Sequence, residues 1–300
     1  MSENNKLPDE HYLSLIREHF PEISFSSAQR FSGGWEHEVF LLDTGVLFRF
    51  PKVERVKDQF KREVALLERI GPRLLALVPH YTFLPKDRSF GGYPAITGTE
   101  LTKEIMLALG AEQREVLAKE VGNFFTALHS TPLALVADLE LEQGFYFSSQ
   151  SIERRWGVMK EIVYPKLAFN EKHWLDAKFS RLLELSSKGE HVLVHGDFTS
   201  GNAFIDTTSG KLTGVIDFGD SECDDPATDF NGLLRLDERF ARQVLAHYDR
   251  PVNDTFMERA LLPSLVHHAD HMREIIKGAD IPVTWEEAHD DLREVMIKYP

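Results

Sequence analysis

Cysteine is almost absent from this chain of 300 residues, which contains only Cys223. A single cysteine cannot form an intramolecular disulfide, and such scarcity is typical of proteins that fold in a reducing cytosol. We expect Cys223 to be a small packing residue, because no base stands beside it in the sequence. Long apolar runs are also missing, since none approaches the roughly 20 residues that a membrane helix needs. We therefore predict a cytoplasmic protein with no membrane partner, and the polar, acidic residues 1–12 predict no signal peptide.

Positive charge is in short supply as well. The chain has 34 Lys and Arg against 48 Asp and Glu, which gives a formal net charge of −14. This balance argues against nucleic acid as a partner, because phosphate backbones require a basic face. An acidic cleft would attract a small cationic substrate, although many cytosolic proteins are acidic for solubility alone. We find no internal repeat or disordered linker, and we expect one compact unit that is a monomer.

The stretch 195–202 carries the most informative residues. Asp197 and Asn202 stand in a polar loop between two apolar runs, and a third run ends at Asp217-Phe218-Gly219. Phosphoryl transfer from a nucleotide needs such a set: one carboxylate accepts the proton of the attacking hydroxyl, while an amide oxygen and a second carboxylate hold Mg²⁺. The protein kinase catalytic loop has the same Asp-x-x-x-x-Asn spacing, and its metal-binding Asp opens the same Asp-Phe-Gly triplet. A plain polar turn explains either motif alone, but it does not explain both in this order.

Three motifs together resemble the aminoglycoside phosphotransferase family, and within it the 2″-phosphotransferase branch. They are His195-Gly-Asp-Phe-x-x-x-Asn, Val215-Ile-Asp-Phe-Gly-Asp and Asp225-Pro-Ala-Thr-Asp-Phe. The resemblance implies an α+β, protein-kinase-like fold. A small N-terminal antiparallel β-sheet lobe (1–97) would bind the nucleotide, and a larger, mainly helical lobe (98–300) would carry catalysis and the substrate. It further implies Mg²⁺, ATP or GTP as phosphate donor, and an aminoglycoside acceptor. A macrolide or small-metabolite kinase remains an alternative, and a nucleotide-binding pseudoenzyme is a more distant one.

The first hundred residues predict a sheet with two helices. A hairpin at Ser32, Gly33 and Gly34 would cover the nucleotide phosphates with its backbone N–H groups, although Gly-Gly alone also fits a plain turn. Ile96, Thr97 and Gly98 would form the hinge that reads the purine edge. The predicted strands are 23–31, 37–42, 46–50, 78–84 and 92–96, and the predicted helices are 9–20 and 56–70.

Arg49 is the expected phosphate-binding cation of this region. It points to the opposite face of its strand from Phe48 and Phe50, and kinases place a Lys at this position. Arginine can bind phosphate through two parallel hydrogen bonds, so the role is compatible with the substitution. Lys52 is the alternative cation. Glu63, beside the apolar face of the helix 56–70, is the expected ion-pair partner of Arg49, with a solvated glutamate as the alternative.

The remaining residues predict mainly helices, with the catalytic strands inserted among them. Apolar residues recur at helical spacing in 111–129, 151–167, 171–187, 226–234, 238–248, 254–277 and 284–298. The second-lobe histidines His267, His268 and His271 have possible zinc spacing, but the absence of a Cys or a general base in the motif favours solvated or substrate-side histidines.

Several carboxylates follow the Asp-Phe-Gly triplet. Asp220 is free to meet a substrate ammonium, and Asp229 is expected to support the catalytic loop. Asp224 and Asp225 fit the start of the next helix, where negative charge complements the helix dipole. In the related enzymes a carboxylate cluster binds the amines of the drug, and the resemblance implies that Asp237 and Glu238 take this role here. The expected substrate residues are therefore Asp197, Asp220, Asp237 and Glu238, although Arg235 and Arg239 interrupt the cluster and would repel an ammonium.

Overall fold

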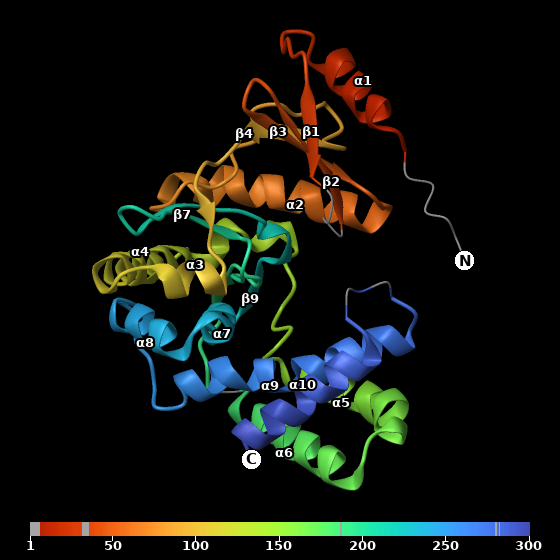
Figure 1. Cartoon of the computed structure of the whole chain (residues 1–300), viewed down its shortest axis with the longest axis vertical. Helices are drawn as coiled ribbons and strands as arrows, with labels where there is room; N and C mark the ends of the chain where they lie inside the picture. The colour runs from red at the N-terminus through yellow and green to blue at the C-terminus, as the bar shows by residue number, and fades with distance from the viewer. Residues whose placement is uncertain (1–6, 32–35, 187, 280, 282) are drawn as a thin grey trace.

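A computed structural model describes residues 7–31, 36–186, 188–279, 281 and 283–300. Figure 1 shows a small β-sheet with two helices at one end of the molecule and a mostly helical remainder below it. The sheet contains β1 (Ala28–Phe31), β2 (His37–Leu42), β3 (Val46–Pro51) and β4 (Gly91–Pro94), all antiparallel and in the order β1-β2-β3-β4. The predicted α+β fold with an N-terminal antiparallel sheet is confirmed.

The sheet is held against α1 (Asp9–His19) by aromatic residues. Phe40, Phe48 and Phe50 project from β2 and β3 into a separate apolar cluster that Ile16 of α1 and Phe90 complete. The rings of Phe50 and Phe90 stack with their centroids 4.7 Å apart. Because side chains alternate along a strand, burial of these phenylalanines turns Arg49 to the other face of β3. The sequence pattern of β3 therefore decides where its cation lies.

The long helix α2 (Glu54–Ile70) packs beneath the sheet, on the side that faces the helical part of the chain (Figure 1). Its apolar stripe includes Phe60, Val64 and Leu67, which join the central core of the molecule. Glu63 lies beside this stripe and is also buried, with 1% of its surface exposed. A buried glutamate requires a partner, because taking an unpaired charge out of water costs on the order of several kcal/mol.

One predicted strand is absent. Residues 78–84 make no strand, and only a single bridge joins Phe83 to Gly92. Pro79 has no N–H to donate to a ladder, which weakens pairing in this stretch. Strand β1 is also shorter than the predicted 23–31. The segment nevertheless places Tyr81 in the core beneath β4, where it contacts Phe60 and Tyr93.

The second part of the chain is mainly helical, as predicted. Two short helical segments, a π-turn at Met159–Val163 and a 3₁₀ turn at Tyr164–Lys166, replace the second half of the predicted helix 151–167. The helix α3 was not predicted. The helices are α3 (Lys103–Ala108), α4 (Ala111–His129), α5 (Ser149–Val158), α6 (Phe169–Leu185), α7 (Ala227–Leu236), α8 (Glu238–Ala246), α9 (Phe256–Ile276) and α10 (Trp285–Lys298).

Two small antiparallel sheets lie between the large sheet and the helices. One has the order β5-β7-β8, and the other pairs β6 with β9. The sequence predicted β6, β7 and β8 but not the short β5 and β9. Their bounds are β5 (Thr99–Glu100), β6 (Val192–Val194), β7 (Ala203–Asp206), β8 (Lys211–Val215) and β9 (Glu222–Asp224). The catalytic motifs follow β6 and β8, so these sheets fix where both loops emerge.

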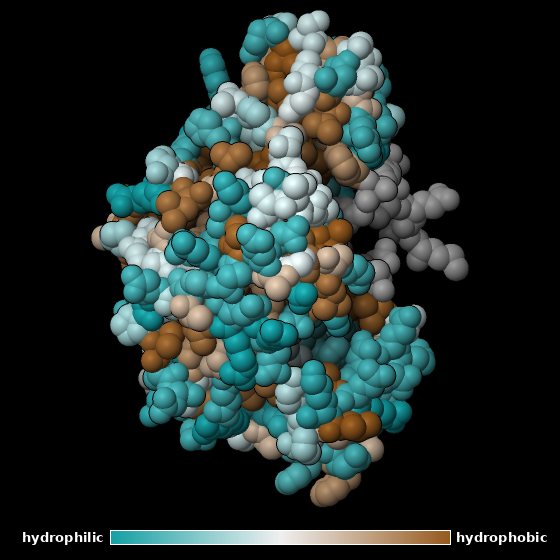
Figure 2. All heavy atoms as spheres, turned by 60° about the vertical axis from the view of Figure 1, so that its left-hand side comes forward, coloured by the Kyte–Doolittle hydropathy of each residue, from teal (hydrophilic) through white to brown (hydrophobic). Residues whose placement is uncertain are grey.

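One face of the molecule is largely polar (Figure 2). Figure 2 shows a face on which hydrophilic residues predominate and apolar residues occur in small groups. Within the described part of the chain, no helix combines the length and apolarity needed to cross a membrane.

Candidate active site

The loop after β6 is fixed by a buried carboxylate. Asp229 of α7 is fully buried, and its two oxygens accept hydrogen bonds from the backbone N–H groups of His195 and Gly196, each at 2.9 Å. The same carboxylate also contacts Nε2 of His129 at 2.9 Å. Burial alone would raise the pKa of Asp229, but the hydrogen bond and charge of His129 outweigh it and lower the pKa. The expected supporting role of Asp229 is therefore what the geometry shows.

Gly196 is the residue that allows this loop to turn. Its φ of +85° lies in the left-handed region, and a Cβ at this position would stand 2.1 Å from the backbone oxygen of Asp220. Only glycine avoids that collision. The close approach brings the loop that carries Asp197 against the loop that carries Asp220.

Asp197 and Asn202 lie side by side in the loop between β6 and β7. The amide nitrogen of Asn202 donates to the backbone oxygen of Asp197 at 2.9 Å and to its carboxylate Oδ2 at 3.0 Å. The backbone oxygen of Asn202 accepts from the N–H of Ile216, which places Asn202 next to Asp217. Burial raises the pKa of Asp197; His195 opposes the shift and the Asp217 carboxylate adds to it.

Asp217 closes this set from the end of β8. Its backbone adopts φ +66°, a left-handed conformation that is uncommon outside glycine and that recurs at functional sites. Its Oδ1 accepts from Nη2 of Arg49 at 2.8 Å, and 46% of its side chain is open to the cleft. The neighbours of Asp217 displace water and would raise its pKa, but the charge and hydrogen bond of Arg49 outweigh them and lower the pKa.

Arg49 connects the sheet, α2 and the catalytic loops. Its Nη1 donates to Glu63 at 2.7 Å and to the Tyr81 hydroxyl at 3.1 Å, and its Nη2 lies 3.3 Å from Nδ1 of His37. The predicted contact between Arg49 and Glu63 is thus present. Burial raises the pKa of Glu63 to about 7, while the Arg49 guanidinium opposes the shift. Burial and the charge of Arg49 lower the pKa of His37 to about 3, so this imidazole is neutral.

A cavity of about 550 Å³ opens between the sheet and the catalytic loops. Arg49 and Asp217 line it, together with Asp197, and apolar side chains of β2 and β3 cover its other wall. Lys52 instead lines a separate pocket between α1 and α2, where its Nζ lies 3.7 Å from Glu38. Of the two candidate cations, the structure therefore brings Arg49 to the cleft.

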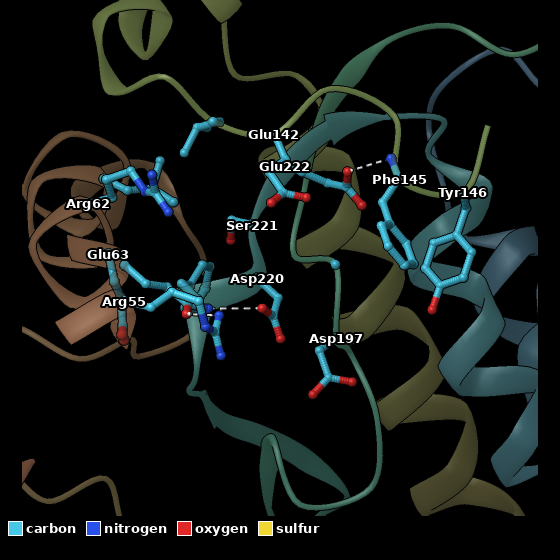
Figure 3. Close-up of a pocket in the computed structure, with 16 residues that line it drawn as sticks. Arg55, Arg62, Glu63, Glu142, Phe145, Tyr146, Asp197, Asp220, Ser221 and Glu222 are labelled. Atoms are coloured by element: carbon cyan, nitrogen blue, oxygen red, sulfur yellow. Dashed lines mark hydrogen bonds between the residues drawn. The ribbon is translucent and has the colours of Figure 1, made fainter. Parts of the chain in front are cut away.

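A second cavity, of about 310 Å³, adjoins the first and shares Asp197 and Asp220 with it. Figure 3 shows side chains converging on it from α2 on one side and from the segment 142–146 on the other, with Asp220 near its centre. Its lining carries charges of both signs, with two arginines from α2 and several carboxylates. The charged residues are Arg55, Arg62, Glu63, Glu142, Asp197, Asp220 and Glu222.

Two carboxylates of the second cavity, Asp220 and Glu222, have raised pKa values. Loss of solvent, with the charges of Asp197 and Asp217, raises the pKa of Asp220 to about 6. Burial and the charge of Asp224 raise the pKa of Glu222 to about 8. Gln59 of α2 donates to Asp220 at 2.9 Å, which connects this carboxylate to the helix that carries Glu63. A cationic ligand would stabilise these groups in their charged form.

Some predicted site residues lie elsewhere. Asp237 caps α8 by accepting from the N–H of Phe240 at 2.8 Å, and Glu238 pairs with Arg242 on the same helix at 2.9 Å. Neither lines the two cavities of the cleft, so the structure does not support their assignment as substrate residues. Asp224 is a second correction: it belongs to β9 and accepts from the N–H of Tyr146 at 3.0 Å instead of beginning a helix. Asp225 does accept from the N–H of Ala227 at the start of α7.

The other predicted positions are placed as follows. Ser32, Gly33 and Gly34 lie outside the described residues. Ile96, Thr97 and Gly98 connect β4 to β5, and β5 pairs with β7 beside the catalytic loop. The ring centroids of His267 and His271 lie 4.2 Å apart, next to Arg235. Among the described residues, no group of three or more His, Cys, Asp or Glu could hold a metal ion.

Sequence reasoning missed several residues of the site, and four of them matter most for its geometry. His37 and Tyr81 contact Arg49, while Phe145 and Tyr146 line the second cavity. The alternation of β2 could have placed His37 on the face of Arg49. The other three have no periodic signal, because they lie in irregular segments between elements.

A cleft of this kind, beneath an antiparallel sheet and above two acidic loops, defines the class of kinase-like phosphotransferases. The comparison with known families agrees. The model of the phosphotransferase enzyme family matches residues 27–261, and the chain therefore belongs to that family. The resemblance to aminoglycoside phosphotransferases is confirmed.

Solved structures show the same fold over nearly the whole chain. The GDP and kanamycin complex of APH(2″)-IIIa has a TM-score of 0.89 at 24% identity, over 97% of this chain and 99% of that one. The streptomycin–ATP complex of APH(2″)-IIa has a TM-score of 0.74 at 23% identity, over 97% of each chain. The macrolide 2′-phosphotransferase MphH of Brachybacterium faecium has a TM-score of 0.71 at 15% identity, over 97% of this chain and 98% of that one.

Proposed function

We propose that this phosphotransferase moves the γ-phosphate of ATP or GTP to a hydroxyl of a small cationic acceptor, an aminoglycoside. The observation that carries the proposal is the position of Asp197, which lines two adjoining cavities at once. One cavity is bounded by Arg49 and Asp217 and suits the phosphates, and the other is lined by further carboxylates and suits an amine-bearing acceptor. A group between donor and acceptor is where the reacting hydroxyl must be held.

Asp197 is the proposed base. Its carboxylate accepts the proton of the acceptor hydroxyl as the oxygen attacks the phosphorus, and the bond from phosphorus to the leaving oxygen of the nucleoside diphosphate breaks. The raised pKa of Asp197 brings its basicity closer to the operating pH, which favours proton transfer. Asn202 donates to the Asp197 carboxylate and so fixes its orientation.

Asn202 and Asp217 are the proposed Mg²⁺ ligands. Their amide and carboxylate oxygens are the hard donors that Mg²⁺ prefers, and two protein ligands suffice because substrate phosphates and water complete such sites. When bound, Mg²⁺ would neutralise charge on the phosphates. In our proposal Arg49, held by Glu63, grips the phosphates, and the backbone of 96–98 reads the base.

The carboxylates around the second cavity support a cationic acceptor. Asp220 faces this cavity from beside Asp197, and Glu142 and Glu222 lie on its far wall (Figure 3). A macrolide remains the second candidate, because a macrolide phosphotransferase also has this fold over nearly the whole chain. We further propose that the enzyme acts in the cytoplasm as a monomer, and that its nucleotide lobe spans 1–97 and its catalytic lobe 98–300.

The test is product formation across an acceptor panel. Kanamycin, gentamicin, streptomycin and one macrolide are incubated with Mg-ATP or Mg-GTP, and phosphorylated products are detected by mass spectrometry. We expect a phosphorylated aminoglycoside with the native enzyme, and a fall in kcat of about 10³-fold or more for Asp197→Asn, with Mg-nucleotide affinity retained. Phosphorylation of the macrolide alone would contradict the aminoglycoside assignment. Nucleotide binding without any product would favour a pseudoenzyme.

A further inference from the structure

Two adjacent aromatic residues form one wall of the second cavity. Phe145 and Tyr146 are only partly buried, and both line the cavity that also contains Asp197 and Asp220. Their ring centroids lie 4.9 Å apart with the planes at 89°. Figure 3 shows both rings projecting from the same stretch of chain on the side of the cavity opposite α2. We call this pair the aromatic wall.

Side chains that are themselves buried hold the backbone of the aromatic wall. The N–H of Phe145 donates to Oε2 of Glu222 at 2.8 Å, and the N–H of Tyr146 donates to Oδ2 of Asp224 at 3.0 Å. Glu222 and Asp224 belong to β9 and are 4% and 0% exposed. Buried carboxylates cost free energy unless they are paired, so their use on two successive N–H groups ties this stretch of chain firmly to β9.

Arg155 of α5 supports the rings from one side. Its guanidinium carbon lies 4.9 Å from the ring centroid of Phe145 and 5.2 Å from that of Tyr146, both at cation–π distance. The Arg155 side chain is 3% exposed and pairs with Asp270 at 3.0 Å. A buried cation therefore contacts both rings, and two buried carboxylates hold the backbone that carries them.

Core packing accounts for only part of this arrangement, since Tyr146 packs against the apolar cluster of the lower helices on one side. The phenylalanines of the core are almost fully buried, whereas Phe145 and Tyr146 keep part of their surface toward the cavity. A rigid aromatic surface beside a reacting group is the kind of surface on which the C–H face of a sugar ring stacks. Arg155 already supplies positive charge at these rings, which disfavours a second cation there and directs the acceptor amines to Asp220 near the centre of the cavity.

We propose that Phe145 and Tyr146 are specificity-determining residues that stack against a sugar ring of the acceptor while its amines contact Asp220. The proposal rests on the proposed function. The Tyr146 hydroxyl stays protonated at working pH, because burial raises the pKa of Tyr146 to about 12, and it can donate to an acceptor oxygen. The ring face supplies the main contribution, and the hydroxyl adds a smaller one.

The test compares two substitutions at one ring with a matched aromatic control. Tyr146→Leu keeps apolar bulk and removes the ring face, and Tyr146→Phe keeps the ring and removes the hydroxyl. Phe169→Ala removes an aromatic ring that is 84% exposed at the start of α6 and lines neither cavity. Calorimetric titration measures the Kd of kanamycin with Mg²⁺ and ADP present, and the Kd of ADP alone. Steady-state kinetics give kcat and the kanamycin KM.

We expect Tyr146→Leu to raise the kanamycin Kd and KM about tenfold, with kcat and the ADP Kd within about twofold. Tyr146→Phe should raise the kanamycin Kd by only about threefold, because the ring is kept and one hydrogen bond is lost, whereas Phe169→Ala should stay within about twofold of the native protein. An unchanged kanamycin Kd in Tyr146→Leu, an equal loss of ADP affinity, or a native protein that does not bind kanamycin would each overturn the proposal. Kanamycin that binds in a Tyr146-dependent way without being phosphorylated would support the aromatic wall and refute the proposed function.

Discussion

Replacement of Arg49 by methionine should make the stability of this protein depend more steeply on pH. The Arg49 and Glu63 side chains are 8% and 0% exposed, and their ion pair spans 2.7 Å. Methionine fills a similar space but leaves Glu63 with the Tyr81 hydroxyl, at 3.2 Å, as its remaining partner. Burial already raises the pKa of Glu63 to about 7 with the arginine present. Without the guanidinium this pKa should rise further, toward the ~8–9 that buried glutamates reach.

The sign of the effect follows from proton binding. Glu63 has an ordinary pKa of about 4.5 in the unfolded chain and a higher one in the folded protein. The folded state therefore binds more protons between the two values, and the free energy of unfolding decreases as the pH rises, by about 1.4 kcal/mol per pH unit. In the native protein this loss ends near pH 7. In Arg49→Met it should continue to about pH 8, within the ~3–5 kcal/mol that breaking a buried ion pair costs.

Urea unfolding of four proteins between pH 6 and pH 8 measures this effect. They are the native protein, Glu63→Gln, Arg49→Met and the variant that carries both substitutions. The double variant lacks the titration of Glu63 but keeps His37, so its comparison with Arg49→Met isolates Glu63. The stability gap between the double variant and Arg49→Met should widen by about 3 kcal/mol from pH 6 to pH 8. The gap between Glu63→Gln and the native protein should widen by about half as much. If the difference in unfolding free energy between the double variant and Arg49→Met stayed constant from pH 6 to pH 8, Arg49 would not be the charge that Glu63 requires.

Three further predictions concern activity. In steady-state assays with ATP and GTP, Arg49→Ala should raise the nucleotide KM by about tenfold or more, and Lys52→Ala should raise it by less than about twofold. The reverse pattern would make Lys52 the phosphate ligand. The kanamycin KM should fall as the pH rises from about 5.5 to about 7.5. Asp220, with a pKa raised to about 6, becomes negative over this range and then attracts the amines of the drug. Asp220→Asn should flatten that profile, and an unchanged slope would remove Asp220 from the acceptor site. Gly196→Ala should lower both the melting temperature and kcat, since its Cβ would stand 2.1 Å from a backbone oxygen; Gly157→Ala, with open space around it, is the control.

The positions of the two loops that carry the proposed catalytic residues were predictable, because they depend on short-range order. Asp197, Asn202 and Asp217 are bounded by apolar strands, and a strand end fixes where the next side chains emerge. Arg49 was predictable for the same reason, since strand alternation turns it away from Phe48 and Phe50. The amphipathic period of α2 placed Glu63 beside the apolar face of that helix, and the likeness to the strand–helix ion pair of kinases suggested its pairing with Arg49.

The walls of the second cavity were not predictable in this way. The positions of Phe145 and Tyr146 depend on hydrogen bonds to Glu222 and Asp224, which lie 77 and 78 residues later in the chain. No local pattern encodes such contacts. A carboxylate before a helix fits both a substrate cluster and a helix cap, and the sequence alone could not separate these two roles for Asp237. Its hydrogen bond to the N–H of Phe240 shows the cap.

The proposed reaction is phosphoryl transfer to an acceptor hydroxyl held by Asp197. Its most direct test follows the label of γ-³²P-ATP or γ-³²P-GTP into kanamycin, for the native enzyme and for Asp197→Asn at equal nucleotide saturation. We expect labelled kanamycin with the native enzyme and at least about 10³-fold slower labelling with the variant. Label released only as inorganic phosphate, or transferred equally fast by Asp197→Asn, would contradict it.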